Sequence, residues 1–158
     1  MPLITALLHT RNDARRLGRC LETLHPCDDI LVVDHHSGDA TARIAREYGA
    51  HVIDHAPGAS PVLNLGGVDS AWLLCLDPRE SLTESLATSL YEWKSLVAPA
   101  APAFAVFLRQ ETPEGWIEIP KPQTRLVPPN WNRWNQTLPA HDVSSLALEG
   151  HLLRFAFP

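Results

Sequence analysis

The segment from residue 31 to residue 41 combines an apolar strand pattern with side chains that could do chemistry. Its apolar residues lead into Asp34, and His35, His36 and Asp39 follow within the next turn. A carboxylate at the carboxyl end of a buried parallel strand lies where α/β folds bind ligands. The same spacing fits two other interpretations. One is an ordinary strand and turn in which Asp39 caps a helix, and the other is a metal cluster that includes the two histidines.

Two further apolar runs end in polar groups of the same kind. Residues 3–8 lead into Thr10-Arg11-Asn12-Asp13, and residues 72–76 lead into Asp77-Pro78-Arg79-Glu80. If these runs are neighbouring parallel strands, their carboxyl ends lie at one edge of a sheet. Whether Asp34, Asp77 and Arg79 converge on one pocket depends on how the strands are arranged.

The elements that must position these groups alternate between short strands and amphipathic helices. Strands are predicted at 3–8, 30–34, 51–54 and 72–76, and helices at 14–24, 41–48 and 81–97. This alternation is typical of βαβ units on a parallel sheet, with Gly49 ending the second helix. Residues 104–109 and 116–119 predict a hairpin, residues 124–127 a further strand, and residues 120–139 an ordered loop that contains tryptophan.

Composition limits the class of protein. The chain has 158 residues, 45% hydrophobic and 20% charged, which fits one domain with a core. The βαβ pattern runs to residue 97, and residues 98–158 follow as a shorter, loop-rich part. Its 13 basic and 18 acidic residues give a net charge of -5 without a basic run, so nucleic acid is not an expected partner.

The cysteines and the N-terminal residues bear on localisation. The three cysteines form no C-x-x-C pair, which favours free thiols in a reducing compartment. The apolar run 3–8 is too short for a membrane span and lacks a basic leader and a cleavage site. We therefore expect a cytoplasmic protein without a transmembrane segment.

The order of these motifs resembles the family 2 glycosyltransferases. The family pattern includes Thr-Lys/Arg-Asn-Glu, then Val-Val-Asp-x-x-Ser-x-Asp-x-Thr, then Arg-Glu-Tyr-Gly-Ala, and finally a strand that ends in Asp-x-Asp. The matching segments here are 10–13, 32–41, 46–50 and 72–77. The similarity covers residues 3 to about 90 and is nearest to the subgroup that acts on lipopolysaccharide core. It implies a GT-A-like, Rossmann-like fold with a mostly parallel sheet, flanking helices and a small antiparallel C-terminal part. In such a single domain, residues 1–97 would form the nucleotide-binding βαβ part and residues 98–158 a short acceptor-side part.

The resemblance also implies roles for individual residues. Thr10, Asn12, Asp13 and Asn64 would bind a nucleotide-diphosphate sugar, with Asp13 standing where the family has Glu. Asp34 would accept a hydrogen bond from the base or ribose, although simple turn geometry explains it equally well. Asp39 is interpreted as a helix N-cap.

The main departure from the family pattern is at Asp77-Pro78-Arg79. The family would place two carboxylates around a Mg²⁺ or Mn²⁺ ion that bridges the donor phosphates, with Asp77 as one ligand. Here Arg79 replaces the second carboxylate, and a cation at that position repels a metal. Either Arg79 pairs directly with phosphate oxygens, or the site is inactive. A solvated turn at Asp77-Pro78 is the structural alternative. The glycine-flanked segment around Asn64 is a second departure, because it predicts a weak helix there or none.

The late pair His141-Asp142 is the candidate general base. An inverting transfer needs a group that deprotonates the acceptor hydroxyl. The pair follows Arg125-Leu126-Val127, an order similar to late elements of the subgroup, and a solvated turn is the alternative. Trp131 and Trp134 would either stack on a sugar or close the core.

The function hypotheses come from different classes. The first is a glycosyltransferase that moves a sugar from a nucleotide-diphosphate donor to a glycan or lipid-linked acceptor with inversion. The second is a relative that keeps the fold as a binding domain and has lost transfer chemistry. A third, suggested by Asp34-His35-His36, is a Mn²⁺-dependent phosphoesterase. Such an enzyme needs more aspartate ligands than the segment 9–13 offers.

Overall fold

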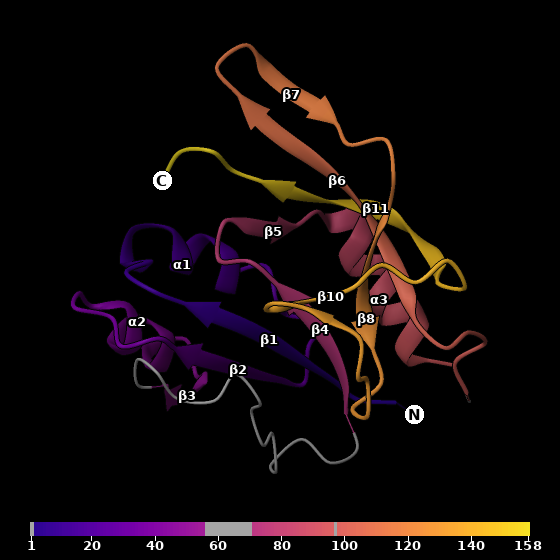
Figure 1. Cartoon of the computed structure of the whole chain (residues 1–158), viewed down its shortest axis with the longest axis horizontal. Helices are drawn as coiled ribbons and strands as arrows, with labels where there is room; N and C mark the ends of the chain where they lie inside the picture. The colour runs from indigo at the N-terminus through magenta and orange to yellow at the C-terminus, as the bar shows by residue number, and fades with distance from the viewer. Residues whose placement is uncertain (1, 56–70, 97) are drawn as a thin grey trace.

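The computed structural model describes residues 2–55, 71–96 and 98–158, and its centre is one mixed sheet (Figure 1). The strand order is β3-β2-β1-β4-β8-β6-β11-β5, and β7 pairs with β6. The strands are β1 (Ile4–Thr10), β2 (Asp29–Asp34), β3 (His51–Asp54), β4 (Trp72–Leu76), β5 (Glu80–Leu82), β6 (Phe104–Thr112), β7 (Gly115–Glu118), β8 (Gln123–Val127), β9 (Trp134–Asn135), β10 (Leu138–Pro139) and β11 (Leu146–Arg154). The helices are α1 (Ala14–Leu21), α2 (Thr41–Glu47) and α3 (Glu84–Lys94).

The parallel half of the sheet confirms the predicted βαβ organisation. β2 and β4 both pair in parallel with β1, and β3 pairs in parallel with β2. The register places Thr10 opposite Asp34, so two of the polar strand ends meet at the same edge. β1 extends two residues beyond the predicted run 3–8, because His9 and Thr10 still pair with β2.

The other half of the chain continues the same sheet. β8 pairs antiparallel with β4 and with β6, and the predicted hairpin is present as β6 and β7. β9 and β10 form a small separate antiparallel sheet. β11 was not predicted, and it runs parallel to β6 along much of its length. Its sequence contains Glu149, Gly150 and His151, which interrupt the alternation that identifies a strand.

The predicted helix 81–97 begins too early. Residues Glu80–Leu82 form β5, which pairs antiparallel with β11. Thr83 then caps α3, since its hydroxyl accepts the Leu86 N–H at 3.3 Å. An edge strand of three residues is too short to show a period, so only its partner strand reveals it.

Hydrophobic side chains cover both faces of the sheet. The larger cluster packs the helices against one face, and Trp93, Trp72 and Phe104 lie in edge-on or tilted contact within it. A smaller cluster on strands β1, β2, β4 and β8 packs against Trp131 and Leu138. Trp131 therefore helps to close the core, whereas Trp134 remains 37% exposed.

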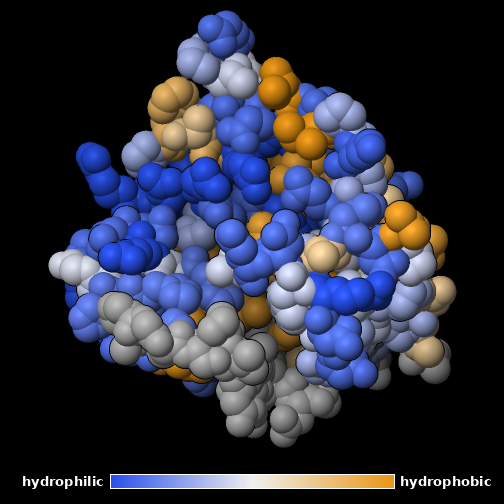
Figure 2. Space-filling view, viewed as in Figure 1, coloured by the Kyte–Doolittle hydropathy of each residue, from blue (hydrophilic) through white to orange (hydrophobic). Residues whose placement is uncertain are grey.

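Figure 2 shows how polar and apolar residues are distributed on one face of the molecule. The face in Figure 2 is mostly hydrophilic, and hydrophobic atoms are visible beside the β6–β7 hairpin at the top. None of the helices in the described ranges is long and apolar enough to cross a membrane.

Candidate functional site

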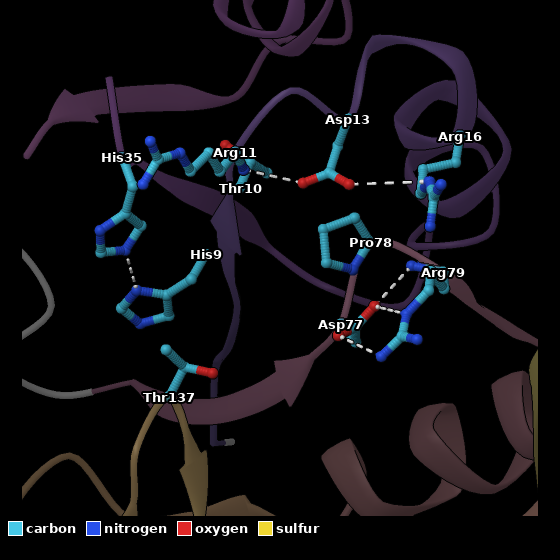
Figure 3. Close-up of a pocket in the computed structure, with 10 residues that line it drawn as sticks. All are labelled: His9, Thr10, Arg11, Asp13, Arg16, His35, Asp77, Pro78, Arg79 and Thr137. Carbon is cyan, nitrogen blue, oxygen red and sulfur yellow. Dashed lines mark hydrogen bonds and ion pairs between the residues drawn. The ribbon is translucent and has the colours of Figure 1, made fainter. Parts of the chain in front are cut away.

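A pocket of about 480 Å³ lies at the carboxyl ends of β1 and β4 (Figure 3). Side chains from five parts of the chain surround it: the end of β1 with the turn after it, the first turn of α1, the residue after β2, the β4–β5 turn and the turn between β9 and β10. The lining residues are His9, Thr10, Arg11, Asp13, Arg16, His35, Asp77, Pro78, Arg79 and Thr137. Of the predicted binding residues, the structure brings Thr10, Asp13, Asp77 and Arg79 together here.

Asp34 lies directly behind the pocket wall and is not among the lining residues. Its Oδ1 accepts the Thr10 hydroxyl at 2.8 Å and the Ser37 hydroxyl at 2.5 Å, and its Oδ2 accepts the Ser37 N–H at 3.1 Å. Burial raises the pKa of Asp34, but the hydrogen bonds from Ser37 and Thr10 outweigh it and hold the pKa below its ordinary value. In the structure this carboxylate fixes Thr10 and the turn after β2.

Asn12 joins the two turns at the edge of the sheet. It adopts a left-handed backbone (φ 54°), which asparagine tolerates better than most residues. Its N–H donates to the Ser37 hydroxyl at 2.9 Å, and its side-chain oxygen accepts the Gly38 N–H at 2.8 Å. Asn12 is absent from the pocket lining, so any contact with a nucleotide stays a prediction.

The prediction that Asp39 is the N-cap of α2 is wrong in position. The N-cap is Ala40, which offers no side-chain acceptor. Asp39 still accepts the Thr41 N–H at 3.0 Å, and it also accepts the N–H of Ala14, the first residue of α1, at 3.3 Å. One carboxylate therefore accepts N–H groups from the first turns of two helices, α1 and α2. A sequence pattern for one helix does not reveal the contact with the other.

Asp13 and Arg16 form one side of the pocket. The Asp13 carboxylate accepts the Arg11 N–H at 2.8 Å, and the Arg16 Nε lies 3.7 Å from its other oxygen. Burial raises the pKa of Asp13, and the nearby carboxylates of Asp77 and Asp39 add to this. The Arg11 N–H and Arg16 lower the pKa by less, so it lies above its ordinary value. The spacing of 3.7 Å is too long for a hydrogen bond, so the Arg16 guanidinium is held only loosely.

Asp77 and Arg79 face each other across one tight turn. The Arg79 Nε donates to Asp77 Oδ1 at 2.9 Å, and its Nη2 donates to Oδ2 at 3.2 Å. The Arg79 backbone N–H also donates to Oδ1 at 2.9 Å. Burial raises the pKa of Asp77, but the bonds from Arg79 outweigh it and lower the pKa below its ordinary value.

A buried ion pair holds this turn from behind. Glu80 and Arg125 are 0% and 1% exposed, and two hydrogen bonds of 2.6 and 2.9 Å join the carboxylate to the guanidinium. Glu80 Oε1 also accepts the Asp77 N–H at 2.8 Å. Arg154, at the end of β11, approaches the same carboxylate at 3.2 Å. Two strands of the C-terminal half therefore determine the shape of a turn in the N-terminal half.

The donor set of the pocket does not fit the divalent cation that the family pattern implies. Arg79 occupies both oxygens of Asp77, and the other pocket carboxylate, Asp13, lies beside Arg16. Within residues 2–55, 71–96 and 98–158, no three His, Cys, Asp or Glu side chains are grouped so as to hold a metal ion. Mg²⁺ and Mn²⁺ need several oxygen ligands free of competing cations.

The histidines after β2 separate into two settings. His35 stacks on His9, with Nδ1 of His9 and Nε2 of His35 2.9 Å apart, and His55 contacts His35 edge-on. His36 instead points to exposed Asp54, 3.9 Å away. Because no group of three metal ligands is present in the part of the chain that the structure describes, the phosphoesterase hypothesis has no metal centre there.

Stacking and burial of these imidazoles predict a stability that depends on pH. Burial, reinforced by His35 and His55, lowers the pKa of His9 from 6.5 to about 4. Between these values the unfolded chain binds a proton that the folded chain excludes, so the free energy of unfolding falls as the pH drops from 6.5 to 4. The pKa difference corresponds to at most roughly 3 kcal/mol.

Denaturant titrations of wild type and of His9→Gln from pH 7 to pH 4 measure this effect. We expect the variant to lose less stability than wild type over this range. His51→Gln is the matched control, because His51 is 74% exposed and lies outside the stack of His9, His35 and His55. Parallel pH profiles for wild type and His9→Gln would contradict the assignment.

His141 and Asp142, the predicted general base, are not among the residues that line the pocket. Asp142 is buried and ion-paired with Arg133, and its Oδ1 accepts the Ser144 N–H at 2.8 Å and the Ser144 hydroxyl at 2.6 Å. Bonds from Ser144 lower the pKa of Asp142, and Arg133 adds to the effect. His141 Nδ1 lies 3.2 Å from the Thr124 hydroxyl. Asn64, the remaining predicted residue, lies outside the described residues.

Sequence reasoning missed several lining residues. His9 and Arg11 flank Thr10, and Arg16 is on the first turn of α1, whose pattern predicts only a helix that packs on the sheet. Their signal was local: each is within a few residues of Thr10 or Asp13. Thr137 gave no signal, because only the β9–β10 hairpin brings it to the strand ends.

Sequence comparison gives the chain several relatives, although no family model matches it. A TPR repeat-containing protein of Synechococcus elongatus is 34% identical over 122 residues, which is 74% of this chain and 30% of that protein. An uncharacterized glycosyltransferase of Rickettsia felis is 33% identical over 95 residues, which is 54% of this chain and 32% of that protein. The chain thus spans about a third of the length of these relatives.

Comparison with solved structures addresses the fold. The crystal structure of S. aureus TarS 1-349 in complex with UDP superposes with a TM-score of 0.53 at 14% identity. The match covers 75% of this chain and 38% of the TarS 1-349 chain. At this identity the likeness concerns the arrangement of strands and helices alone.

Proposed function

We propose that the pocket of this chain binds a nucleotide-diphosphate sugar, as expected of a glycosyltransferase. The chain is similar in sequence to a protein named as a glycosyltransferase and shares its fold with the UDP complex of TarS 1-349. The observation that supports this most is the position and charge of the pocket. It lies at the carboxyl ends of parallel strands β1 and β4 and is lined by three arginines and two aspartates. Ligands of open α/β sheets bind at this edge, and guanidinium groups match phosphate oxygens.

The reaction that follows is transfer of the sugar to an acceptor hydroxyl with inversion. The acceptor oxygen forms a bond to the anomeric carbon as the bond from that carbon to the β-phosphate oxygen breaks. The electron pair leaves with the nucleoside diphosphate, and a general base takes the hydroxyl proton. A glycan or a lipid-linked hydroxyl is the proposed acceptor.

His141 and Asp142 remain our proposal for this base. The β9–β10 hairpin carries Thr137 into the pocket, and the chain reaches His141 four residues later. Asp142 is already bound to Arg133 and Ser144, so the proton would go to the exposed imidazole of His141. Under this proposal His141→Ala lowers kcat for transfer and leaves nucleotide affinity unchanged.

One observation favours a second candidate, a binding domain without transfer chemistry. Arg79 occupies the carboxylate that the family pattern assigns to a metal ion. A pocket in this state can recognise a nucleotide without activating its leaving group. The two candidates share nucleotide binding and differ only in turnover.

Calorimetry followed by a turnover assay tests the proposal. Isothermal titrations with UDP, GDP and their glucose or mannose conjugates measure binding, and release of free nucleotide from the conjugate measures donor cleavage. Binding with release supports the transferase, and binding without release supports the binding domain. If none of these ligands produces heat or protects the chain against thermal unfolding, the proposed function is wrong.

A further inference from the structure

The arginines of the pocket carry an inference about how the phosphates are held, and it rests on the proposed function. Arg79 and Arg16 come from different elements, the β4–β5 turn and α1, and both line the same pocket (Figure 3). Two guanidinium groups from two elements can engage two successive phosphates. A bound molecule with a single carboxylate would need only one of the two guanidinium groups.

Arg79 is oriented and still has donors to offer. Asp77 takes its Nε and one Nη, whereas a guanidinium has more N–H donors than one carboxylate accepts. Its side chain is 43% exposed, so the remaining N–H groups are accessible to a ligand. Asp77 thus fixes the orientation of the Arg79 guanidinium plane at the pocket wall.

Arg16 and Arg11 are less constrained than Arg79. Neither guanidinium donates a hydrogen bond to any residue in the described ranges, and the nearest carboxylate contact of Arg16 is 3.7 Å long. Their charge makes the pocket more basic than the chain, whose net charge is -5. The stacked imidazoles of His9 and His35 add no charge near neutral pH, because burial lowers both pKa values.

We propose that Arg79, with Arg16, binds the diphosphate of the nucleotide directly and without a divalent cation, while Asp77 positions Arg79. A cation at Asp77 would have to displace two hydrogen bonds from Arg79 and would meet the repulsion of both arginines. The pocket therefore uses fixed guanidinium charge where the family pattern uses metal charge.

Isothermal titration of the full chain tests this with uridine, UMP and UDP, and with the guanosine series in parallel. Each ligand is measured in EDTA and again with millimolar MnCl₂. We expect equal affinities in the two buffers, and diphosphate binding that is tighter than nucleoside binding. Arg79→Ala should weaken the diphosphate by about ten- to a hundredfold, the range for hydrogen bonds to charged groups. It should leave the nucleoside affinity unchanged.

The variants separate phosphate recognition from folding. Arg79→Lys keeps the charge but loses the two-pronged geometry, so its diphosphate affinity should lie between those of wild type and Arg79→Ala. Arg16→Ala should also weaken the diphosphate selectively. Arg43→Ala is the matched control, because Arg43 is exposed on α2, pairs with Glu47 and is absent from the pocket lining.

The outcomes distinguish the inference from the function on which it rests. Diphosphate binding that disappears in EDTA and returns with MnCl₂ overturns the inference and leaves the proposed function standing. Unchanged diphosphate affinity in Arg79→Ala also overturns it. If neither nucleotide series binds in either buffer, the proposed function fails, and the inference fails with it.

Discussion

Arg125→Met should destabilise the protein by about 3 kcal/mol or more, although Arg125 is not among the residues that line the pocket. The substitution leaves Glu80 fully buried without its main partner, and an uncompensated buried charge costs several kcal/mol. Arg154 and the Asp77 N–H remain as partners, which places the expected loss toward the lower end of that range. Chemical denaturation of both proteins at neutral pH measures the difference.

Two comparisons show whether the buried pair is responsible. The double variant Glu80→Leu with Arg125→Met removes both charges, and we expect it to be more stable than Arg125→Met alone. Arg43→Met removes a guanidinium from an exposed pair on α2 and should cost less than about 0.5 kcal/mol. If Arg125→Met were as stable as Arg43→Met, the buried pair would contribute no net stability.

Arg125→Met should also weaken ligand binding in the pocket. Glu80 accepts the Asp77 N–H, so a displaced Glu80 changes the turn that presents Arg79. Nucleotide titrations of Arg125→Met, at a temperature where the variant is folded, should show weaker diphosphate binding than wild type.

Gly150→Ala should destabilise the protein by about 3 kcal/mol, because the substitution combines backbone strain with a clash. Gly150 has φ +96°, where a side chain costs on the order of 1–3 kcal/mol. A Cβ there would lie 2.3 Å from the Leu86 N and 2.6 Å from its Cα, both on the backbone of α3. These atoms are not the flexible end of a side chain, so α3 or β11 must move, at about 1–3 kcal/mol more.

Gly115→Ala separates the two contributions. Gly115 also has a positive φ, +124°, but nothing lies within 4 Å of an added Cβ. Thermal unfolding should therefore show a smaller loss for Gly115→Ala than for Gly150→Ala. Equal losses would mean that contact with α3 contributes nothing.

The position of Gly150 explains both its conformation and the failure to predict β11. The register of β11 against β6 shifts between Ala147 and His151, so the strand has an irregularity that contains Gly150. Glycine supplies the positive φ at such bulges, and it allows α3 to approach the sheet closely. The same irregularity breaks the alternation of apolar and polar residues, so sequence inspection misses the strand.

The sequence by itself determined the parallel half of the fold and the edge where the pocket lies. Strong local patterns did this: apolar runs that end in Thr10, Asp34 and Asp77, with amphipathic segments between them. The family resemblance came from the same segments. Each of these patterns depends only on residues that are close together in the sequence, because periodicity and turn-forming residues are local features.

Only the tertiary structure decided which polar groups face the pocket and which serve as supports. The sequence left Asp34 open between a ligand contact and a turn residue, and the structure shows Asp34 and Asn12 bonded to Thr10, Ser37 and Gly38. Their contact with a ligand stays a prediction. Arg125 looks like an ordinary strand residue, yet it holds the Asp77 turn through Glu80. Thr10 and Asp34 are 24 residues apart, and Glu80 and Arg125 are 45 residues apart. Such pairs become neighbours only in the folded sheet, so local sequence does not encode them.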